Sequence, residues 1–283
     1  MTAFYKLSGS GNDFVALVES VPEPDPDSEQ IRAWCRRGVS LGADGLFALR
    51  RRGDGVEMAY WNADGLPADL CLNGTRCAAQ LAFHLGWATE RVRIATAAES
   101  VEARRLDASR VALELPAPPA PSARTVAAGG SWSGWSVLVG VPHFVLAWPE
   151  SLARAPVREL GRALRYAPDF APAGTNVDFV RFPDPGTVEI RTYERGVEDE
   201  TLSCGSGVLA AAAVGLALGR SRPAPGSPLL VRTQGGFTLE VGMGEPESGA
   251  PAPRWTLGGD ARVVAEGELL PGAASPAPPP AWS

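Results

Sequence analysis

Two cysteines, Cys71 and Cys204, stand in front of glycine-containing segments that lead into helical patterns. Cys71 opens the segment CLNGTRC, and Cys204 opens CGSG. A thiol at the start of a helix faces free N–H groups and the positive end of the helix dipole, both of which favour the thiolate form. A thiolate can remove a proton from carbon and a thiol can return one. Two such cysteines facing one carbon would therefore suit racemisation or epimerisation.

The segments that follow these cysteines also suggest how a substrate's charge would be held. Glycines after each cysteine let the backbone approach an anion such as a carboxylate. The two helix N-termini would then stabilise the negative charge that develops as the proton leaves. The remaining cysteines, Cys35 and Cys77, are interpreted as buried structural thiols, because a lone cysteine usually behaves as a small apolar side chain.

Three asparagines beside expected strands are candidates for substrate binding. Asn12 and Asn176 precede strands, and Asn62 follows one in the segment WNADG. A structural role in a turn is the alternative for each of them, because asparagine side chains readily bond their own backbone.

Charged and titratable residues near Cys204 form a second group of candidates. Glu194 and Arg195 end a strand shortly before it. They could bind the ammonium and carboxylate groups of an amino acid by charge-assisted hydrogen bonds, with a surface ion pair as the alternative. His143, in the segment VPH, could tune the protonation of a thiol.

The composition excludes several other classes of protein. The net charge is −6, and Lys6 is the only lysine among 26 basic residues. This charge does not suit a nucleic-acid binder, and Lys6 alone could carry pyridoxal phosphate as a Schiff base. With only two histidines and no CxxC pair, a zinc site is not expected either. We therefore expect no cofactor and no metal, and a small amino-acid substrate as the partner.

The chain also lacks the marks of secretion and of membrane insertion. Its N-terminus has neither the cationic nor the apolar region of a signal peptide. The longest apolar run, Val208–Leu218, is too short to cross a bilayer, which takes about 20 residues. Four cysteines in 283 residues do not form a disulfide framework. We expect a soluble, cytoplasmic protein with reduced thiols.

An internal repeat appears when the two cysteine segments are aligned. The matches pair Cys71 with Cys204, Tyr60 with Tyr193, Gly74 with Gly207, Ala78–Ala79 with Ala211–Ala212, and Leu85–Gly86 with Leu218–Gly219. A second similarity joins Asn12–Val15 to Asn176–Val180. A repeat of this length sets the architecture, so we expect two related halves.

Hydrophobic periodicity indicates the elements of each half. It predicts helices over Asn73–Leu85 and Val208–Leu218, the second of them buried because it is apolar on all sides. It predicts strands over Asp13–Val18, Glu57–Trp61, Val92–Ala95, Arg110–Leu115, Ser136–Val141, Val177–Arg181, Thr187–Thr192 and Leu229–Thr233. The expected fold class is α+β (α/β). Two pseudo-symmetric domains each wrap a curved, mainly antiparallel sheet around a central helix, with the active site in the cleft between them.

The boundary between the halves follows from composition. The first half is placed at residues 1–118 and the second at 131–258. The segment Pro116–Gly130 is rich in Pro, Ala and Gly and is expected to be a linker or a surface loop. Residues 271–283 are expected to form a disordered tail.

Taken together, these motifs resemble the diaminopimelate epimerase family, a cofactor-independent group in the superfamily that includes proline racemase. The resemblance covers nearly the whole chain. It is carried by GSGNDF at 9–14, GADG at 42–45, NADG at 62–65, CLNGTRCA at 71–78, PH at 142–143, NV at 176–177, ERGVEDET at 194–201 and CGSG at 204–207. The family converts LL-2,6-diaminopimelate to the meso form.

The resemblance implies roles for individual residues. Cys71 and Cys204 would be the acid–base pair, and His143 and Glu194 would modulate their pKa values. Substrate contacts would come from Asn12, Asn62, Leu72, Asn73, Asn176, Glu194, Arg195, Gly205 and Ser206. The resemblance also implies a homodimer, and a strand at residues 259–270 that returns to the first half.

Departures from the family pattern leave alternatives open. Leu72 and Val141 stand where the family usually has Gly and Asn, and that Asn would contact the distal end of diaminopimelate. A racemase or epimerase of another amino acid is therefore the alternative within the superfamily. From other classes, a Cys–His thiol hydrolase could use His143 with Glu194, and a non-enzymatic binding module would need neither repeated cysteine.

Overall fold

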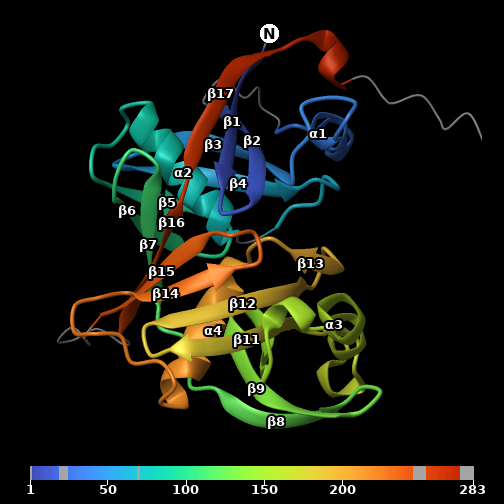
Figure 1. Ribbon diagram of the computed structural model, residues 1–283. Helices are drawn as coiled ribbons and strands as arrows, with labels where there is room; N and C mark the ends of the chain where they lie inside the picture. The colour runs from blue at the N-terminus through green and yellow to red at the C-terminus, as the bar shows by residue number, and fades with distance from the viewer. Residues whose placement is uncertain (1, 19–24, 69–70, 245–252, 275–283) are drawn as a thin grey trace, which may run out of the picture. The chain divides into compact units, whose positions relative to one another are not determined.

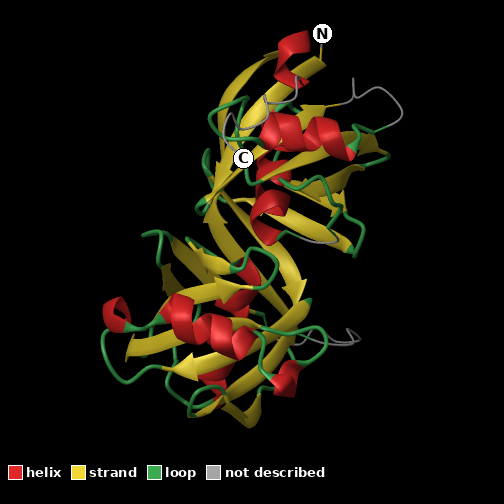
Figure 2. Ribbon diagram, turned by 90° about the vertical axis from the view of Figure 1, so that its right-hand side faces the viewer, coloured by secondary structure: helices red, strands yellow, loops and turns green. Residues whose placement is uncertain are grey.

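The chain folds into two compact units. The computed structural model describes residues 2–18, 25–68, 71–244 and 253–274. Unit 1 comprises Met1–Leu113 and Asp260–Ser283, and unit 2 comprises Glu114–Gly259 (Figure 1). Each unit is built mainly from strands, with helices packed against them (Figure 2).

Unit 1 contains a mixed sheet. Its elements are β1 Thr2–Gly9, β2 Asn12–Val18, α1 Ser28–Cys35, β3 Gly45–Arg52, β4 Gly55–Asn62, α2 Leu72–His84, β5 Arg91–Ala95, β6 Ser100–Arg105 and β17 Arg262–Leu269. The strands pair in the order β17, β1, β2, β3, β4, β5 and β6. Neighbours are antiparallel except for β2–β3 and β4–β5. Those two parallel pairs are connected through α1 and α2, as parallel pairing requires a crossover.

Unit 2 repeats this arrangement. Its elements are β8 Ser122–Ala127, β9 Ser131–Val139, β10 Val141–Ala147, α3 Val157–Arg165, β11 Asn176–Asp184, β12 Thr187–Glu194, β13 Asp199–Thr201, α4 Gly205–Ala217, β14 Leu229–Thr233, β15 Thr238–Met243 and β16 Arg254–Asp260. The strands pair in the order β8, β9, β10, β11, β12, β14 and β15, and only β10–β11 and β12–β14 are parallel. The order and directions match those of unit 1. Strand β7, Arg110–Pro116, passes from one unit to the other.

A central helix in each unit contacts most of the surrounding strands. Helix α2 touches β1 through β6 and β17, and α4 touches β9 through β12, β14 and β15. Residues Leu72 to Phe83 of α2 are all buried, and α4 is buried from Gly207 to Gly215. The two predicted helices are therefore confirmed, as is the α+β class with a sheet wrapped around a helix in each half.

A second helix covers the outer face of each sheet. Ile31 and Trp34 of α1 pack into one apolar cluster with Val15 and Leu46, and α3 occupies the same position in unit 2. Strands buried on both faces read as continuous apolar runs rather than alternating patterns, as Phe14–Leu17 does in β2. Both outer helices are short, and the sequence analysis missed them.

The prediction that Pro116–Gly130 forms a linker or a surface loop is wrong. Within Pro116–Gly130, residues Ser122–Ala127 form β8, which pairs antiparallel with β9 along its whole length. Only Val126 of this strand is buried. Because five of its six side chains are partly or fully exposed small or polar groups, the apolar signal of a strand is absent from the sequence.

The prediction that Asn12–Val15 and Asn176–Val180 are equivalent segments of the repeat is also wrong. Asn12 begins β2, whose place in the sheet corresponds to β10, whereas Asn176 begins β11, which corresponds to β3. Strands covered by helices on both faces share apolar patterns whatever their place in the sheet, which explains the resemblance. The predicted strand Ser136–Val141 likewise spans two strands, since the turn at Gly140 (φ 67°) separates β9 from β10.

The end of the chain returns to unit 1. The strand expected at residues 259–270 corresponds to β17, which pairs antiparallel with β1 from Thr2↔Leu269 to Ser8↔Arg262. The expected tail begins with a short 3₁₀ turn at Pro271–Ala274, and residues 275–283 lie outside the described part of the chain. No helix among the described residues has the length and apolar character to span a bilayer.

Candidate active site

Cys71 occupies the N-cap position of α2. Its backbone is extended (φ −134°, ψ 102°), and its Sγ accepts a hydrogen bond from the Gly74 N–H at 3.4 Å. Its carbonyl oxygen accepts from the Thr75 N–H at 2.8 Å and from Thr75 Oγ1 at 2.9 Å. The sulfur therefore lies at the positive end of the helix, half-buried, and accepts from a backbone N–H, an arrangement that stabilises a thiolate.

Cys204 occupies the corresponding position in α4. Its backbone is also extended (φ −119°, ψ 111°), its side chain is buried, and its Sγ lies 3.4 Å from Ser206 Oγ. Burial raises the pKa of the Cys204 thiol well above its usual value, and the carboxylates of Glu194 and Asp178 raise it further. Cys204 is therefore a thiol near neutral pH. The expectation that the helix start makes it a thiolate is wrong, because desolvation and two nearby carboxylates outweigh the helix N-terminus.

His143 is completely enclosed in unit 2 and bonded at both ring nitrogens. Nδ1 lies 2.7 Å from Asp178 Oδ2, and Nε2 lies 2.9 Å from Ser206 Oγ. The Asn176 amide nitrogen lies 3.3 Å from the same Nε2. The parallel register of β10 and β11, which places His143 opposite Asn176, brings these residues together. His143 thus contacts Cys204 through Ser206.

Asp178 is a buried carboxylate beside His143 that the sequence analysis missed. Its second oxygen, Oδ1, accepts from Thr192 Oγ1 at 2.7 Å. A signal was present in the sequence, because Asn176 and Asp178 are two residues apart in a strand and so point to the same face. Gly207 is the other part of the signal. A Cβ at that position would lie 2.6 Å from Asp178 Oδ1, so only glycine lets the helix approach the carboxylate.

Glu194 and Arg195 stand at the end of β12 but do not pair with each other among the described residues. Glu194 Oε2 accepts from Thr201 Oγ1 at 2.9 Å, and burial raises the pKa of the Glu194 carboxyl. The Arg195 backbone N–H donates to Asn176 Oδ1 at 2.6 Å, and its guanidinium reaches the Ala173 carbonyl at 3.3 Å. The surface ion pair considered as the alternative is absent from this part of the structure.

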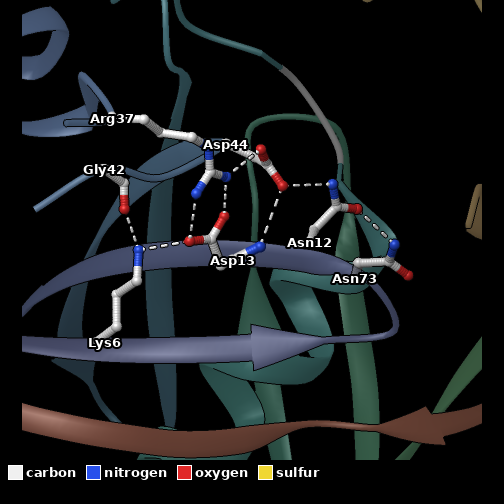
Figure 3. A network of polar contacts seen from close by, with 7 residues as sticks. All are labelled: Lys6, Asn12, Asp13, Arg37, Gly42, Asp44 and Asn73. Carbon is white, nitrogen blue, oxygen red and sulfur yellow. Dashed lines mark hydrogen bonds and ion pairs between the residues drawn. The ribbon is translucent and has the colours of Figure 1, made fainter. Parts of the chain in front are cut away.

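In unit 1 two of the predicted asparagines, Asn12 and Asn73, are joined in a line of hydrogen bonds (Figure 3). Arg76 Nη2 donates to Asn73 Oδ1 at 2.5 Å, and Asn73 Nδ2 donates to Asn12 Oδ1 at 2.7 Å. Asn12 Nδ2 in turn donates to Asp44 Oδ2 at 3.0 Å. The guanidinium at one end can only donate and the carboxylate at the other can only accept, so the orientation of both amides is determined.

Arg76 is the least expected member of this line. It is completely buried, and burial lowers the pKa of its guanidinium. Its Nη2 also donates to Ser10 Oγ at 3.0 Å, and Ser10 donates through both its N–H and its hydroxyl to Asp260 Oδ1. A residue near the end of the chain therefore supports the helix start that carries Cys71.

Lys6, the only lysine, lies at the far side of the same network. Its Nζ forms an ion pair with Asp13 Oδ2 at 2.7 Å and donates to the Gly42 carbonyl (Figure 3). Burial opposes ionisation of Asp13, yet hydrogen bonds from Arg37 and Lys6 hold its pKa below the usual value. A Schiff base with pyridoxal phosphate needs a neutral, accessible amine, whereas the Lys6 amine is held in an ion pair with Asp13. Among the described residues, no group of three or more His, Cys, Asp or Glu could hold a metal.

Three predicted substrate contacts remain outside both networks. Asn62 is exposed at the end of β4, where its Oδ1 accepts from Tyr60 Oη at 3.1 Å and its backbone closes a turn with Leu66 and Gly65. Leu72 and Gly205 are the first residues of α2 and α4, and both are buried. Each places a free helix N-terminal N–H beside its cysteine.

Replacing Asn12 with Asp tests the line of amides. The new carboxylate would face Asp44 where an N–H now donates, so we expect the free energy of unfolding at pH 7 to fall by about 1–3 kcal/mol. Repulsion between the two carboxylates raises their pKa values, so the loss should shrink toward pH 4 as one of them is protonated. Urea unfolding at pH 7 and pH 4 measures both effects. Asn62→Asp, at an exposed asparagine of the same unit, is the matched control, and equal losses for the two variants would contradict the prediction.

Comparison with known proteins gives consistent results. The family model for diaminopimelate epimerase matches residues 4–114 and 135–246. A diaminopimelate epimerase from Aquifex aeolicus is 36% identical over 251 residues, covering 84% of this chain and 88% of the relative. One from Archaeoglobus fulgidus is also 36% identical over 251 residues, covering 83% and 87%.

Solved structures share the fold at much lower identity. A probable proline racemase from Agrobacterium radiobacter superposes with a TM-score of 0.70 at 18% identity, covering 98% of this chain and 96% of its own. A hydroxyproline epimerase from Agrobacterium vitis gives 0.63 at 17% identity, covering 94% and 91%. At this identity the similarity establishes the two-unit fold alone.

Proposed function

The chain belongs to the diaminopimelate epimerase family, and from this premise we propose that it converts LL-2,6-diaminopimelate to the meso form with Cys71 and Cys204 as its two proton carriers. One observation supports the proposal above the others. Two units of the same topology each place one cysteine at the N-cap of the central helix. A buried structural thiol would have no reason to recur at that position.

The different environments of the two sulfurs suggest their starting roles. Cys71 accepts a hydrogen bond from a backbone N–H and serves as the base, whereas buried Cys204 keeps its proton and serves as the acid. Cys71 takes the α-proton, and the electron pair left on carbon is delocalised into the substrate carboxylate. Cys204 then gives its proton to the opposite face of that carbon. Cys71 ends as a thiol and Cys204 as a thiolate, so the reverse reaction uses the same pair in exchanged roles.

The N-termini of α2 and α4 would hold the substrate carboxylate. The N–H groups of Leu72, Asn73, Gly205 and Ser206 stand at these ends, where helix dipoles stabilise added negative charge. The side chains of Asn12, Asn62, Asn176, Glu194 and Arg195 would bind the remaining polar groups of the amino acid. His143 and Glu194 would tune the two thiols. The homodimer and the cytoplasmic location are likewise proposed. The first rests on the family resemblance, and the second on four cysteines that form no disulfide framework.

A racemase or epimerase of another amino acid is the second candidate. Val141 favours it, because this residue opens β10 two positions before His143 and presents no amide to a distal substrate group. The Cys–His hydrolase has less support, since Ser206 stands between Cys204 and His143.

Exchange of α-protons in D₂O tests the proposal. With purified protein and no added pyridoxal phosphate, we expect LL-diaminopimelate to give meso product that carries deuterium at the inverted carbon. L-Histidine, L-glutamate and L-proline should not exchange, and dialysis against a chelator should leave the rate unchanged. NMR follows both the loss of the α-proton signal and the appearance of the meso form. Exchange of another amino acid alone would favour the second candidate, and loss of activity on dialysis would contradict a cofactor-independent reaction.

A further inference from the structure

Four side chains of unit 2 form an unbroken line of hydrogen bonds that ends at Cys204. The steps are 3.4 Å from Cys204 Sγ to Ser206 Oγ, 2.9 Å from Ser206 Oγ to His143 Nε2, and 2.7 Å from His143 Nδ1 to Asp178 Oδ2. The side chains of His143 and Asp178 are both 0% exposed. Water therefore cannot replace any step at the inner end of the line.

The chemistry of the partners sets the direction of each hydrogen bond. Asp178 can only accept, so Nδ1 of His143 carries the proton and a neutral imidazole leaves Nε2 as an acceptor. Ser206 then donates to Nε2 at 2.9 Å, and the Asn176 amide nitrogen donates to the same Nε2 at the longer distance of 3.3 Å. The Ser206 oxygen can accept from the Cys204 thiol. Every proton in the line is aligned for transfer from Cys204 toward His143.

We propose that Ser206, His143 and Asp178 form a proton relay for Cys204, with Asp178 as the positioning residue. When Cys204 must become a thiolate, its proton moves to Ser206 Oγ while the Ser206 hydroxyl proton moves to His143 Nε2. The products are a thiolate, an unchanged serine and an imidazolium held by the Asp178 carboxylate. The reverse transfer returns a proton to Cys204 after it has protonated substrate.

The corresponding position of unit 1 carries a different side chain. The residue of α2 that matches Ser206 in the cysteine alignment is Asn73, whose amide bonds Asn12 and Arg76. An amide does not exchange protons in this way. Cys71 accepts from the Gly74 N–H, a hydrogen bond that favours a thiolate.

The charged and titratable groups around His143 give the proposal a distinctive test. The charges of Asp178 in β11 and Glu194 in β12 both raise the pKa of the Cys204 thiol. His143 and Asp178 in turn shift the pKa of the Glu194 carboxyl. As simple negative charges, Asp178 and Glu194 both oppose a thiolate at Cys204. Removing either charge would then make Cys204 more reactive. In the relay, Asp178 stabilises the imidazolium that forms with the thiolate, so removing its charge would make Cys204 less reactive.

The experiment measures alkylation of Cys204 by iodoacetamide in the full chain carrying Cys71→Ala. Peptide mass spectrometry follows the rate from pH 7 to pH 10. We expect Asp178→Asn and Ser206→Ala each to slow alkylation about tenfold at pH 8, which corresponds to a rise of about one unit in the apparent pKa of Cys204. Ser206→Thr keeps the hydroxyl and should stay within about twofold of the parent. Glu194→Gln, the matched control, should speed alkylation.

The outcomes separate the relay from its alternatives. Faster alkylation of Asp178→Asn, as in Glu194→Gln, would show that Asp178 acts only as a nearby charge, and the relay would be wrong. Labelling of Ser206 by a fluorophosphonate would make Ser206–His143–Asp178 an acylating triad instead and would also contradict it. Circular dichroism of each variant checks the fold, and the Ser206 pair remains informative if Asp178→Asn does not fold. The proposal rests on the proposed function for the catalytic role of Cys204, yet alkylation needs no substrate. Failure of the D₂O exchange and failure of the relay are therefore distinguishable.

Discussion

Replacing either Cys71 or Cys204 with alanine is expected to slow epimerisation of LL-diaminopimelate by about a thousandfold or more. A positioned proton carrier contributes roughly 10²–10⁴ to such a rate, and inversion needs one carrier on each face of the carbon. Neither loss can be covered by a neighbour. Among the described residues, the other two cysteines are buried at Cys35 in α1 and at Cys77 inside α2.

The two variants should nevertheless differ from an inactive, unfolded protein. In the Cys204→Ala variant, Cys71 can still remove an α-proton and return a deuteron to the same face. NMR in D₂O should therefore show slow exchange in the LL substrate with no meso product. Cys35→Ala is the control and should keep the parental rate. Meso formation at a near-normal rate by either active-site variant would show that the two-base assignment is incorrect.

A steep loss of stability above pH 9 is the second large effect that we expect. Burial raises the pKa of Cys35 to about 12 and also raises the pKa values of Cys77 and Cys204. In the unfolded chain these thiols ionise near pH 8.5. Because the folded protein holds protons that the unfolded chain releases, stability is complete below pH 8.5 and falls as the pH rises toward the folded pKa values.

The magnitude follows from proton linkage. Each of Cys35 and Cys77 costs about 1.4 kcal/mol per pH unit in this window, so the two together cost roughly 3 kcal/mol per unit. From pH 8.5 to 10.5 the loss is roughly 5 kcal/mol, a large part of the whole stability of a typical domain, about 5–15 kcal/mol. Urea unfolding under a reductant at pH 8, 9 and 10 measures the slope. Cys35→Ala should reduce it by up to about half, and a free energy of unfolding that stays constant from pH 8 to pH 10 would disprove the effect.

The central helices and their cysteines were predictable from sequence for a physical reason. Each helix has a strong local signal, which is helical spacing of apolar and small residues in Asn73–Leu85 and a continuous apolar run in Val208–Leu218. The internal repeat shows that the two helices correspond to each other. The N-cap position of a cysteine follows directly from where such a helix begins. Local signals of this kind do not depend on the rest of the fold.

Asp178 and Arg76 could not be assigned in the same way. Asp178 reaches His143 only because β10 and β11 pair in parallel, and Arg76 reaches Asp260 only because the end of the chain returns to unit 1 through Ser10. The protonation of Cys204 was also mispredicted. A helix N-terminus can be read from sequence, whereas the burial of a sulfur and the carboxylates around it depend on long-range packing.

The position of β17 in the chain determines the order in which the strands of unit 1 become available during synthesis. Unit 2 is one continuous stretch, Glu114–Gly259, so a ribosome synthesises all of it before the last strand of unit 1. Until Arg262–Leu269 emerges, β1 has an open edge along the side where β17 later pairs. Asp260, which holds Ser10 and through it Arg76, is equally late. The first hundred residues therefore stay incomplete until the segment after unit 2 has been made, and the helix start at Cys71 gains its final support only then.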